Sequence, residues 1–314
     1  MSPRVAVIDV GSNSIKALVA RKQDGIFGIE AIYEESLEVR ISRGIGGEPP
    51  MLMPDRIEAG VEAVPRLWKA CQDHGPLKRS QIVATSAVRS AANGHLFTES
   101  VEAETGLAPV ILTGAEEADG IANGVRTDPN IEDRLDDFTV FDLGGGSLEL
   151  IRFEHHGVTD RTSLPLGSVR LTEQFISSPG EPIPNHEAEA LSNYVREHIV
   201  ATDFPIRAPL VGCSGGLAAL RQILARDRDP ESCDNHSRFS RARIQRLRET
   251  VLSQDLDQRI QLSGLPPHRA DIFPAALLTF EVIMELGQAD ALTHSFHNLR
   301  YGLAWALLNE LEQG

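Results

Sequence analysis

The chain has 314 residues, 41% of them hydrophobic and 24% charged, proportions typical of a globular protein large enough for two domains. Its formal net charge of −15 argues against nonspecific binding to nucleic acid or to an anionic membrane, because both require a basic surface. The three cysteines are widely spaced and form neither a disulfide framework nor a zinc-ligand pattern. No apolar run approaches the roughly 20 residues of a membrane span, and the short apolar start does not fit a signal peptide. We therefore expect a cytoplasmic protein.

Predicted strands alternate with predicted helices along the chain, which favours an α/β fold. The first half is expected to begin with two strands over 4–20, more β-like alternation over 26–41 and a helix near 57–71. A strand ending at 85 then precedes a small-residue helix, and a strand at 110–112 precedes a helix from about 115. The polar stretch 126–137 is the best linker candidate. The second half is expected to contain a strand–turn–strand unit from 140, a strand–turn–helix unit over 209–224, a helix at 273–284 and a last helix at 299–311.

An internal repeat carries more weight than any single element. "VIDVGSNS" and "VFDLGGGS" share one pattern, in which Asp9 and Asp142 each end an apolar run and a glycine turn follows. In a P-loop or a dinucleotide-binding fingerprint the glycines lead into a helix, whereas here a second β-like run follows. The repeat therefore predicts a duplicated, actin-like fold with an interdomain cleft. We expect one domain at 1–125, a second at 126–298, and a terminal helix at about 299–314 that packs back on the first.

The glycine turn of the second half is suited to binding a phosphate. Three glycines, Gly144, Gly145 and Gly146, allow backbone N–H groups to converge on an anion that no Cβ blocks. Asp142 would repel that anion unless a cation intervenes, and Mg²⁺ binds carboxylate, water and phosphate oxygens together. Ser147 and Glu149 face the same side of a strand, where Ser147 can donate to phosphate and Glu149 can hold a metal-bound water. The alternative is a tight hairpin with exposed acids, which the duplicate at Asp9 disfavours.

Two further groups of polar residues have both a structural and a functional interpretation. Glu116 and Glu117 open a helix, where acids complement the helix dipole, yet a carboxylate there can also orient water for attack on phosphorus. Thr85 and Arg89 form either an ordinary helix start or a phosphate contact.

Ser214 and Gly215 are also ambiguous, because they either line a ligand cleft or allow close helix packing. The basic run from Arg238 to Arg248 is interpreted as a solvated helix face rather than as a polyanion track.

Eight motifs in the expected order give the chain a family resemblance along nearly its whole length. They are "AVIDVGSNS", "ATSAVRSA", "LTGAEEA", "VFDLGGGSLEL", "LPLGSVRL", "GCSGG", "HRADIFPAAL" and "NLRYGLAWALL". The sequence resembles the exopolyphosphatase / guanosine pentaphosphate phosphohydrolase (Ppx/GppA) family. The resemblance implies a two-domain actin-like fold, hydrolysis of a terminal phosphoanhydride with Mg²⁺, and a homodimer.

Residue roles follow from the same resemblance. Glu117 matches the water-activating glutamate, Asp142 and Glu149 match metal-associated acids, and Arg89 matches a phosphate-contacting arginine. The loop residues Asp9, Ser12, Asn13, Ser14, Gly144, Gly145, Gly146 and Ser147 match the two phosphate-side loops, with Asp9 also expected on the metal. Arg40 lies where the family has a basic residue near the cleft. Ser214 and Gly215 are expected to bind phosphate as well, and Thr85 and Arg300 are further candidates. Tyr301 stands where the family usually has a glutamate, and the chain has no His-Asp dipeptide, so it resembles the short form of the family.

The favoured function is release of terminal phosphate from inorganic polyphosphate. The nearest alternative is conversion of pppGpp to ppGpp by the same residues, and the sequence contains no base-binding motif that decides between the two. Two alternatives belong to other classes: an actin-like kinase, and a ligand sensor that does not hydrolyse. Phosphate release without an acceptor favours a hydrolase, and retention of Glu117, Asp142 and Glu149 disfavours a sensor.

Overall fold

The computed structural model describes residues 2–24, 28–45, 47–131, 136–226 and 237–313. The chain divides into two compact units, the first made of residues 1–133 and 297–314 and the second of residues 134–296. Residues 132–135 of the predicted linker lie outside the described residues, as does Cys233. The α/β class and the organisation into two units agree with the sequence prediction.

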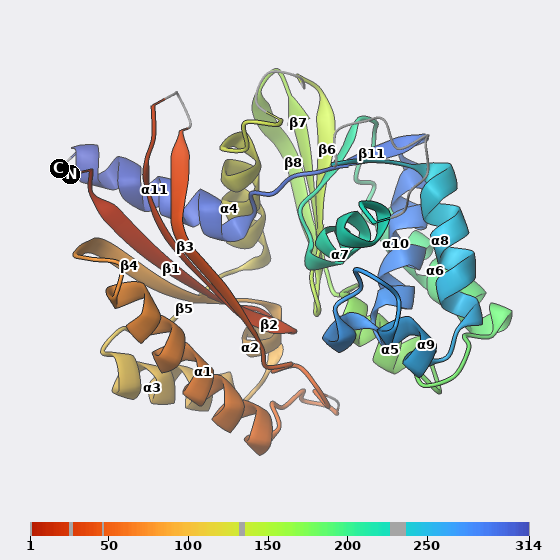
Figure 1. Ribbon diagram of the computed structural model, residues 1–314, viewed down its shortest axis with the longest axis horizontal. Coiled ribbons are helices and arrows are strands. Elements are labelled where there is room, and N and C mark those ends of the chain that lie inside the picture. The colour runs from red at the N-terminus through yellow and green to blue at the C-terminus, as the bar shows by residue number, and fades with distance from the viewer. Residues whose placement is uncertain (1, 25–27, 46, 132–135, 227–236, 314) are drawn as a thin grey trace. The chain divides into compact units, whose positions relative to one another are not determined.

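The first unit is built around a five-stranded sheet of order β3-β2-β1-β4-β5 (Figure 1). Its strands are β1 (Arg4–Val10), β2 (Ser14–Lys22), β3 (Ile29–Glu38), β4 (Leu77–Ala84) and β5 (Val110–Ile111). Its helices are α1 (Pro54–Gln72), α2 (Ser86–Ser90), α3 (Gly94–Thr105), α4 (Gly114–Arg126) and α11 (Leu299–Gln313). Strands β1, β2 and β3 are antiparallel neighbours, while β1, β4 and β5 run parallel.

Both faces of this sheet are buried, because successive strand residues point to opposite sides. From β1, Ala6 and Ile8 join the core that includes residues of α1 and α3, whereas Val5 and Val7 join the core that includes residues of α11. The unit therefore has three layers, with the sheet in the middle. Helix α11 belongs to this unit although the whole second unit precedes it in the sequence.

Helices α4 and α11 cross closely, and Figure 1 shows them side by side. A Cβ on Gly302 of α11 would overlap the carbonyl oxygen of Gly120 in α4, and a Cβ on Gly124 would overlap the carbonyl of Asn298. Only glycine permits this approach. Because the first turn of α4 carries Glu117, the crossing fixes the helix that presents this carboxylate.

The second unit contains a six-stranded sheet of order β10-β11-β9-β6-β7-β8. Its strands are β6 (Phe138–Leu143), β7 (Leu148–Glu154), β8 (Gly157–Leu164), β9 (Leu210–Gly212), β10 (Arg238–Ser240) and β11 (Ala291–His294). Its helices are α5 (Ser168–Phe175), α6 (Asn185–Val200), α7 (Gly215–Leu224), α8 (Arg241–Ser253), α9 (Leu256–Ile260), the short 3₁₀ helix Pro267–Arg269 and α10 (Phe273–Leu286).

The two sheets share one topology. In the second unit β6, β7 and β8 are antiparallel neighbours and β6, β9 and β11 run parallel, so the order β8-β7-β6-β9-β11 reproduces β3-β2-β1-β4-β5. Strand β10 is the addition, and it pairs antiparallel with β11. The duplication inferred from two short motifs therefore extends over whole sheets, as an actin-like fold requires.

The core of the second unit gathers residues of β6, β7 and all its longer helices, with α10 at its centre. The predicted apolar stripe of α10, from Phe273 to Met284, is buried throughout. Its neighbour Arg259 of α9 is also fully buried, and its guanidinium donates to four carbonyl groups: those of Asp255 (3.3 Å), Ala270 (3.2 Å), Pro179 (2.7 Å) and Glu181 (2.9 Å). This side chain joins its own helix to the nearby segment at Ala270 and to the distant segment 179–181.

We expect Arg259→Met to lower the free energy of unfolding by about 3 kcal/mol or more, because buried carbonyls would lose their donors. Urea denaturation measures this change. The exposed Arg246 of α8 provides a matched control, and Arg246→Met should change the free energy by less than about 0.5 kcal/mol. Equal effects of the two substitutions would contradict the assigned role of Arg259.

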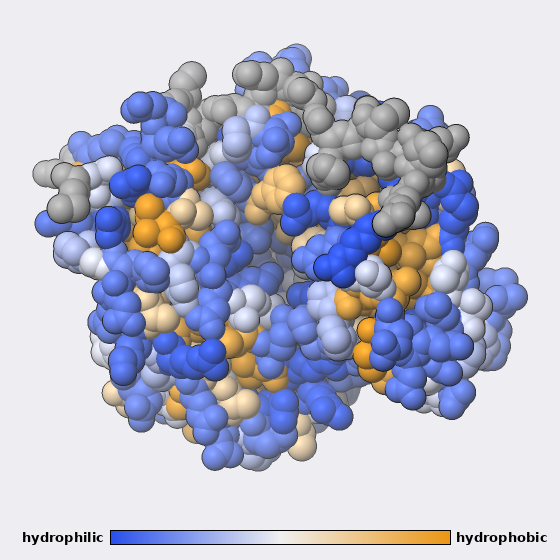
Figure 2. Space-filling model, viewed as in Figure 1, coloured by the Kyte–Doolittle hydropathy of each residue, from blue (hydrophilic) through white to orange (hydrophobic). Residues whose placement is uncertain are grey.

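The surface is mostly hydrophilic on the face drawn in Figure 2, and apolar residues appear there in small patches. Among the described residues, no helix is both long enough and apolar enough to cross a membrane. Cys71 and Cys213 are buried free thiols.

Candidate functional site

The two units carry matching turns at the ends of β1 and β6. In the first, the N–H of Gly11 donates to the carbonyl of Ser14 over 3.1 Å; in the second, the N–H of Gly144 donates to the carbonyl of Ser147 over 2.9 Å. Each turn follows the carboxyl end of a central strand whose neighbour on one side is parallel, at the edge where α/β sheets bind ligands.

The turn of the second unit is held by its carbonyl groups. The carbonyl of Gly144 accepts from the backbone N–H of Ser168 (2.9 Å) and from its hydroxyl (3.2 Å). The carbonyl of Gly145 accepts from the N–H groups of Val169 (3.0 Å) and Arg170 (3.2 Å). Because the C=O and N–H of a trans peptide point in opposite directions, the N–H groups of Gly145 and Gly146 point away from α5.

Neither of these two N–H groups has an acceptor within the described part of the chain. They are therefore available to an anion, as the sequence predicts for the glycine turn. Gly144 differs from its neighbours, since its N–H already donates to the carbonyl of Ser147 within the turn; phosphate binding by the glycine turn stays a prediction.

The turn of the first unit follows the same rule with different partners. The carbonyl of Ser12 accepts from the N–H and the hydroxyl of Ser42, each over 3.1 Å, so the N–H of Asn13 points away from that loop. No described residue accepts from this N–H. The carbonyl of Asn13 accepts from the N–H of Arg40 (2.8 Å), whose backbone has the left-handed φ of 53°. Such strain in a non-glycine residue is typical of functional sites.

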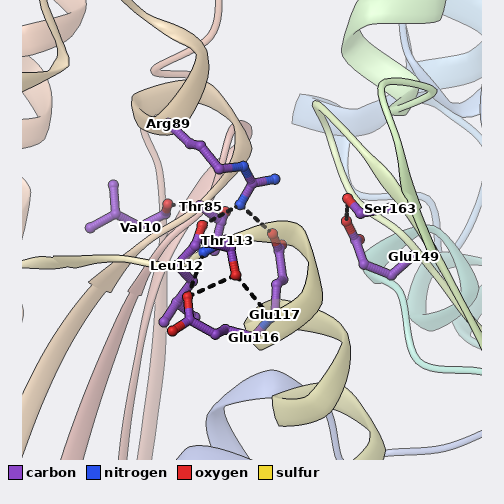
Figure 3. Close-up of polar contacts among 9 residues, drawn as sticks. All are labelled: Val10, Thr85, Arg89, Leu112, Thr113, Glu116, Glu117, Glu149 and Ser163. Carbon is purple, nitrogen blue, oxygen red and sulfur yellow. Dashed lines mark hydrogen bonds and ion pairs between the residues drawn. The ribbon is translucent and has the colours of Figure 1, made fainter. Parts of the chain in front are cut away.

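An acidic pair lies on the two strands that flank the turn of the second unit. Asp142 of β6 and Glu149 of β7 are direct cross-strand partners, so their side chains lie on the same face of the sheet. Glu149 is only 1% exposed, and its Oε1 accepts from the hydroxyl of Ser163 on β8 over 2.7 Å (Figure 3). Ser163 is not among the residues predicted from the sequence, because its position opposite Glu149 depends on the pairing of β7 with β8.

The first turn of α4 separates the roles of its two glutamates, as Figure 3 shows. Glu116 forms a capping box: its carboxylate accepts from the N–H of Thr113 (2.8 Å), and the hydroxyl of Thr113 accepts from the N–H of Glu116 (3.2 Å). Glu117 is 7% exposed, and its Oε2 accepts from Nη1 of Arg89 over 2.9 Å. The structural interpretation is therefore right for Glu116, whereas Glu117 is a buried, oriented carboxylate.

Arg89 orients Glu117 from the neighbouring helix α2. Its Nη1 also donates to the carbonyl of Leu112 over 2.6 Å, which fixes the guanidinium beside the end of β5. Thr85, which precedes α2, donates its N–H to the carbonyl of Val10 (3.2 Å), the last residue of β1. These contacts hold Arg89 and Glu117 near the turn of the first unit. All of them lie at the carboxyl ends of β1, β4 and β5.

Removal of the Arg89 guanidinium should destabilise the first unit, because Glu117 would lose its charged partner in a buried position. We expect Arg89→Met to lower the free energy of unfolding by about 1–3 kcal/mol. The double variant Arg89→Met/Glu117→Gln should recover part of this loss, since no buried charge is then left without a counter-charge. Urea denaturation of the three proteins tests the coupling, and strictly additive effects would contradict it.

Three other predicted residues have structural partners. Ser214 caps α7, because its hydroxyl accepts from the N–H of Leu217 over 3.1 Å. A Cβ on Gly215 would lie 2.6 Å from a guanidinium nitrogen of Arg269. Arg300 is 8% exposed and donates to the carbonyl of Ala17 (2.8 Å) and to Glu34 (3.2 Å), which ties α11 to the sheet. In the structure Ser214 caps a helix, Gly215 leaves room for a guanidinium, and Arg300 connects α11 to the sheet.

The acidic residues have the chemistry of a site for a hard divalent cation. Oδ1 of Asp9 is buried and has no hydrogen-bond partner among the described residues. Burial raises the pKa of this carboxyl, against the opposing charges of Lys16 and Arg300. Oxygen ligands of this kind suit Mg²⁺. The described residues contain no preassembled cluster of three or more His, Cys, Asp or Glu side chains, so the magnesium site stays a prediction.

The model of the Ppx/GppA phosphatase family matches residues 18–311, and the chain belongs to this family. The sequence prediction of the family is thereby confirmed.

Named relatives are longer than this chain. A guanosine-5′-triphosphate,3′-diphosphate pyrophosphatase of Vibrio vulnificus (strain YJ016) is 30% identical over 321 residues, a match that covers 99% of this chain and 61% of that protein. One of Aliivibrio fischeri (strain ATCC 700601 / ES114) is 29% identical over 319 residues, with coverages of 99% and 61%. The chain thus spans less than two thirds of the length of these curated relatives.

Solved structures share the fold over their full length. A crystal structure of an exopolyphosphatase from Cytophaga hutchinsonii ATCC 33406 has a TM-score of 0.83 at 22% identity, with 98% of each chain covered. The Aquifex aeolicus member of the Ppx/GppA family has a TM-score of 0.78 at 26% identity, with coverages of 100% of this chain and 99% of that one.

Proposed function

We propose that the protein is a Mg²⁺-dependent hydrolase that releases the terminal phosphate of inorganic polyphosphate. The observation that carries this proposal is the pair of matched turns, in which the acceptor-free N–H groups of Gly145 and Gly146 follow Asp142 by three and four residues and that of Asn13 follows Asp9 by four. Membership of a phosphatase family supports it.

The chemistry follows from the roles that the residues can take. The N–H groups of Gly145 and Gly146 hold oxygens of the terminal phosphoryl group, and that of Asn13 binds from the first unit. Glu117, oriented by Arg89, accepts a proton from the attacking water. The water oxygen bonds to the terminal phosphorus, the bridging P–O bond breaks, and the shortened chain leaves with the electron pair. A bound Mg²⁺, held by Asp142 and Glu149 with Asp9, would offset phosphate charge.

Because the net charge is negative, the mechanism requires positive charge close to the site. At −15, the whole molecule repels a polyanion at long range, so local cations must reverse the field at the site. The KM for polyphosphate should therefore depend strongly on Mg²⁺ and salt.

The alternative substrate is pppGpp. The names of the Vibrio and Aliivibrio relatives favour it, since these are guanosine-5′-triphosphate,3′-diphosphate pyrophosphatases. The same residues would then remove the 5′ terminal phosphate and leave ppGpp. We further propose a cytoplasmic location, where either substrate would be met; a homodimer stays a prediction.

Phosphate release tests the proposal directly. Short polyphosphate, long polyphosphate and pppGpp are compared at equal terminal-phosphate concentration, each with Mg²⁺ and with excess chelator. We expect Mg²⁺-dependent release without any acceptor, fastest on polyphosphate. Faster release from pppGpp would select the alternative substrate. A strict requirement for ADP or a sugar would indicate a kinase, and binding of all three without release would indicate a sensor.

A further inference from the structure

The first turn of helix α5 donates its backbone N–H groups to the glycine turn of the second unit. The first N–H groups of a helix lack partners within the helix and often bind an anion. In α5 they are instead consumed by the neighbouring glycine turn, since Ser168, Val169 and Arg170 all donate to carbonyls of Gly144 and Gly145. The motif "LPLGSVRL", to which the sequence analysis assigned no role, supplies this turn.

Gly167 makes this close approach possible. A Cβ at this position would overlap the backbone of Gly145 and Gly146, so any larger residue would push α5 away from the turn. The constraint is one of space, because the φ of Gly167 is −69°, a value that any residue adopts.

The hydrophobic core fixes the other side of α5. Leu166 and Leu171 are fully buried, Val169 is 5% exposed, and the helix packs against α6 and α10. The turn is therefore attached to a rigid element rather than to a loop.

We propose that the first turn of α5 sets the direction of the Gly145 and Gly146 N–H groups, with Ser168 as the positioning residue. Ser168 is the strongest candidate because both its N–H and its hydroxyl donate to the carbonyl of Gly144. Two donors on one carbonyl fix the plane of the Gly144–Gly145 peptide and hence the direction in which its N–H points. The inference rests on the proposed function, in that the ligand of these N–H groups is a phosphoryl group.

Helix α5 also offers a matched control. One turn after Ser168, the hydroxyl of Thr172 donates to the carbonyl of Ser168 over 2.8 Å, and the two residues are 4% and 5% exposed. Thr172→Val thus removes a buried hydroxyl from the same helix without touching the glycine turn. Ser168→Ala removes the hydroxyl donor to the carbonyl of Gly144 and keeps the backbone donor, and Ser168→Thr keeps a hydroxyl.

The experiment uses the ¹⁵N-labelled full chain with pyrophosphate as the probe. In Ser168→Ala, we expect the amide signals of Gly145 and Gly146 to move in the free protein. The Kd for pyrophosphate should rise by about 3- to 10-fold, with a similar fall in kcat/KM for polyphosphate. Ser168→Thr should recover most of the loss, and Thr172→Val should leave signals, Kd and kcat/KM as in the wild type.

Two results would overturn the inference. One is equal behaviour of Ser168→Ala and Thr172→Val. The other is a wild-type chain that hydrolyses polyphosphate while its Gly145 and Gly146 signals ignore pyrophosphate, a result that leaves the proposed function intact. Conversely, a wild-type chain whose signals respond as expected but that releases no phosphate would contradict the proposed function and support the inference.

Discussion

Replacement of Glu117 by glutamine should reduce kcat for phosphate release by about 10²- to 10⁴-fold, the usual contribution of a general base. The amide oxygen can still accept from Arg89, so the side chain should keep its position while it loses the ability to take a proton. KM should change little, because Glu117 is not assigned to substrate binding. Initial rates over a range of polyphosphate concentrations separate the two constants.

Glu116 is the matched control for this substitution. It is the preceding residue in the same helical turn, and glutamine also serves at its capping-box position. Glu116→Gln should therefore leave both kcat and the unfolding midpoint close to their wild-type values. A loss of activity in Glu116→Gln as large as in Glu117→Gln would show that activity depends on the first turn of α4 as a whole. It would contradict a specific role for the Glu117 carboxylate.

Replacement of Asp142 by asparagine should have opposite effects on activity and stability. Like charges directly across two strands destabilise a sheet, so the substitution should raise the free energy of unfolding in chelator by about 0.2–1 kcal/mol. The same change removes a ligand of the proposed Mg²⁺ and should lower kcat/KM by about 100-fold or more. Thermal denaturation in chelator and phosphate-release rates in Mg²⁺ measure the two effects.

Asp160→Asn provides the comparison for Asp142→Asn, since Asp160 is an exposed aspartate of the same sheet, opposite Arg152. Because its cross-strand partner is basic, Asp160→Asn should lower the free energy of unfolding by about 0.2–1 kcal/mol, the opposite sign to Asp142→Asn, and should leave kcat/KM unchanged. If Asp142→Asn retained full Mg²⁺-dependent activity, the proposed metal ligands would be wrong.

The fold was predictable where the pattern is local. The hairpin at each glycine turn follows from apolar runs of strand length interrupted by small residues, and their repetition predicted two related sheets. Helix α10 follows from an apolar stripe with helical spacing. Helix α6 was missed, although Ala188, Leu191, Val195 and Ile199 have the same kind of spacing and are buried.

The candidate site was predictable in residue type but not in pairing. Glu117 and Arg89 are 28 residues apart, and no local pattern shows that one orients the other. The sequence likewise could not show that Gly144 uses its N–H within the turn, or that Ser168 holds its carbonyl. Such contacts depend on how strands and helices pack, which residue order alone does not determine.

The basic run also needed tertiary structure for its interpretation. Helix α8 buries Ile244, Leu247 and Val251, so its arginines flank a core-facing stripe. Arg248 lies 3.4 Å from Glu281 of α10, and Arg243 donates to the carbonyl of Leu224. The solvated-face interpretation therefore holds only in part.

The most direct test of the account is hydrolysis of polyphosphate in ¹⁸O-labelled water with Mg²⁺, followed by mass spectrometry of the released phosphate. Attack of water on the terminal phosphorus predicts one ¹⁸O atom in each released phosphate and none in the shortened chain. Label in the new chain end instead, or phosphate release that persists unchanged in excess chelator, would contradict the mechanism.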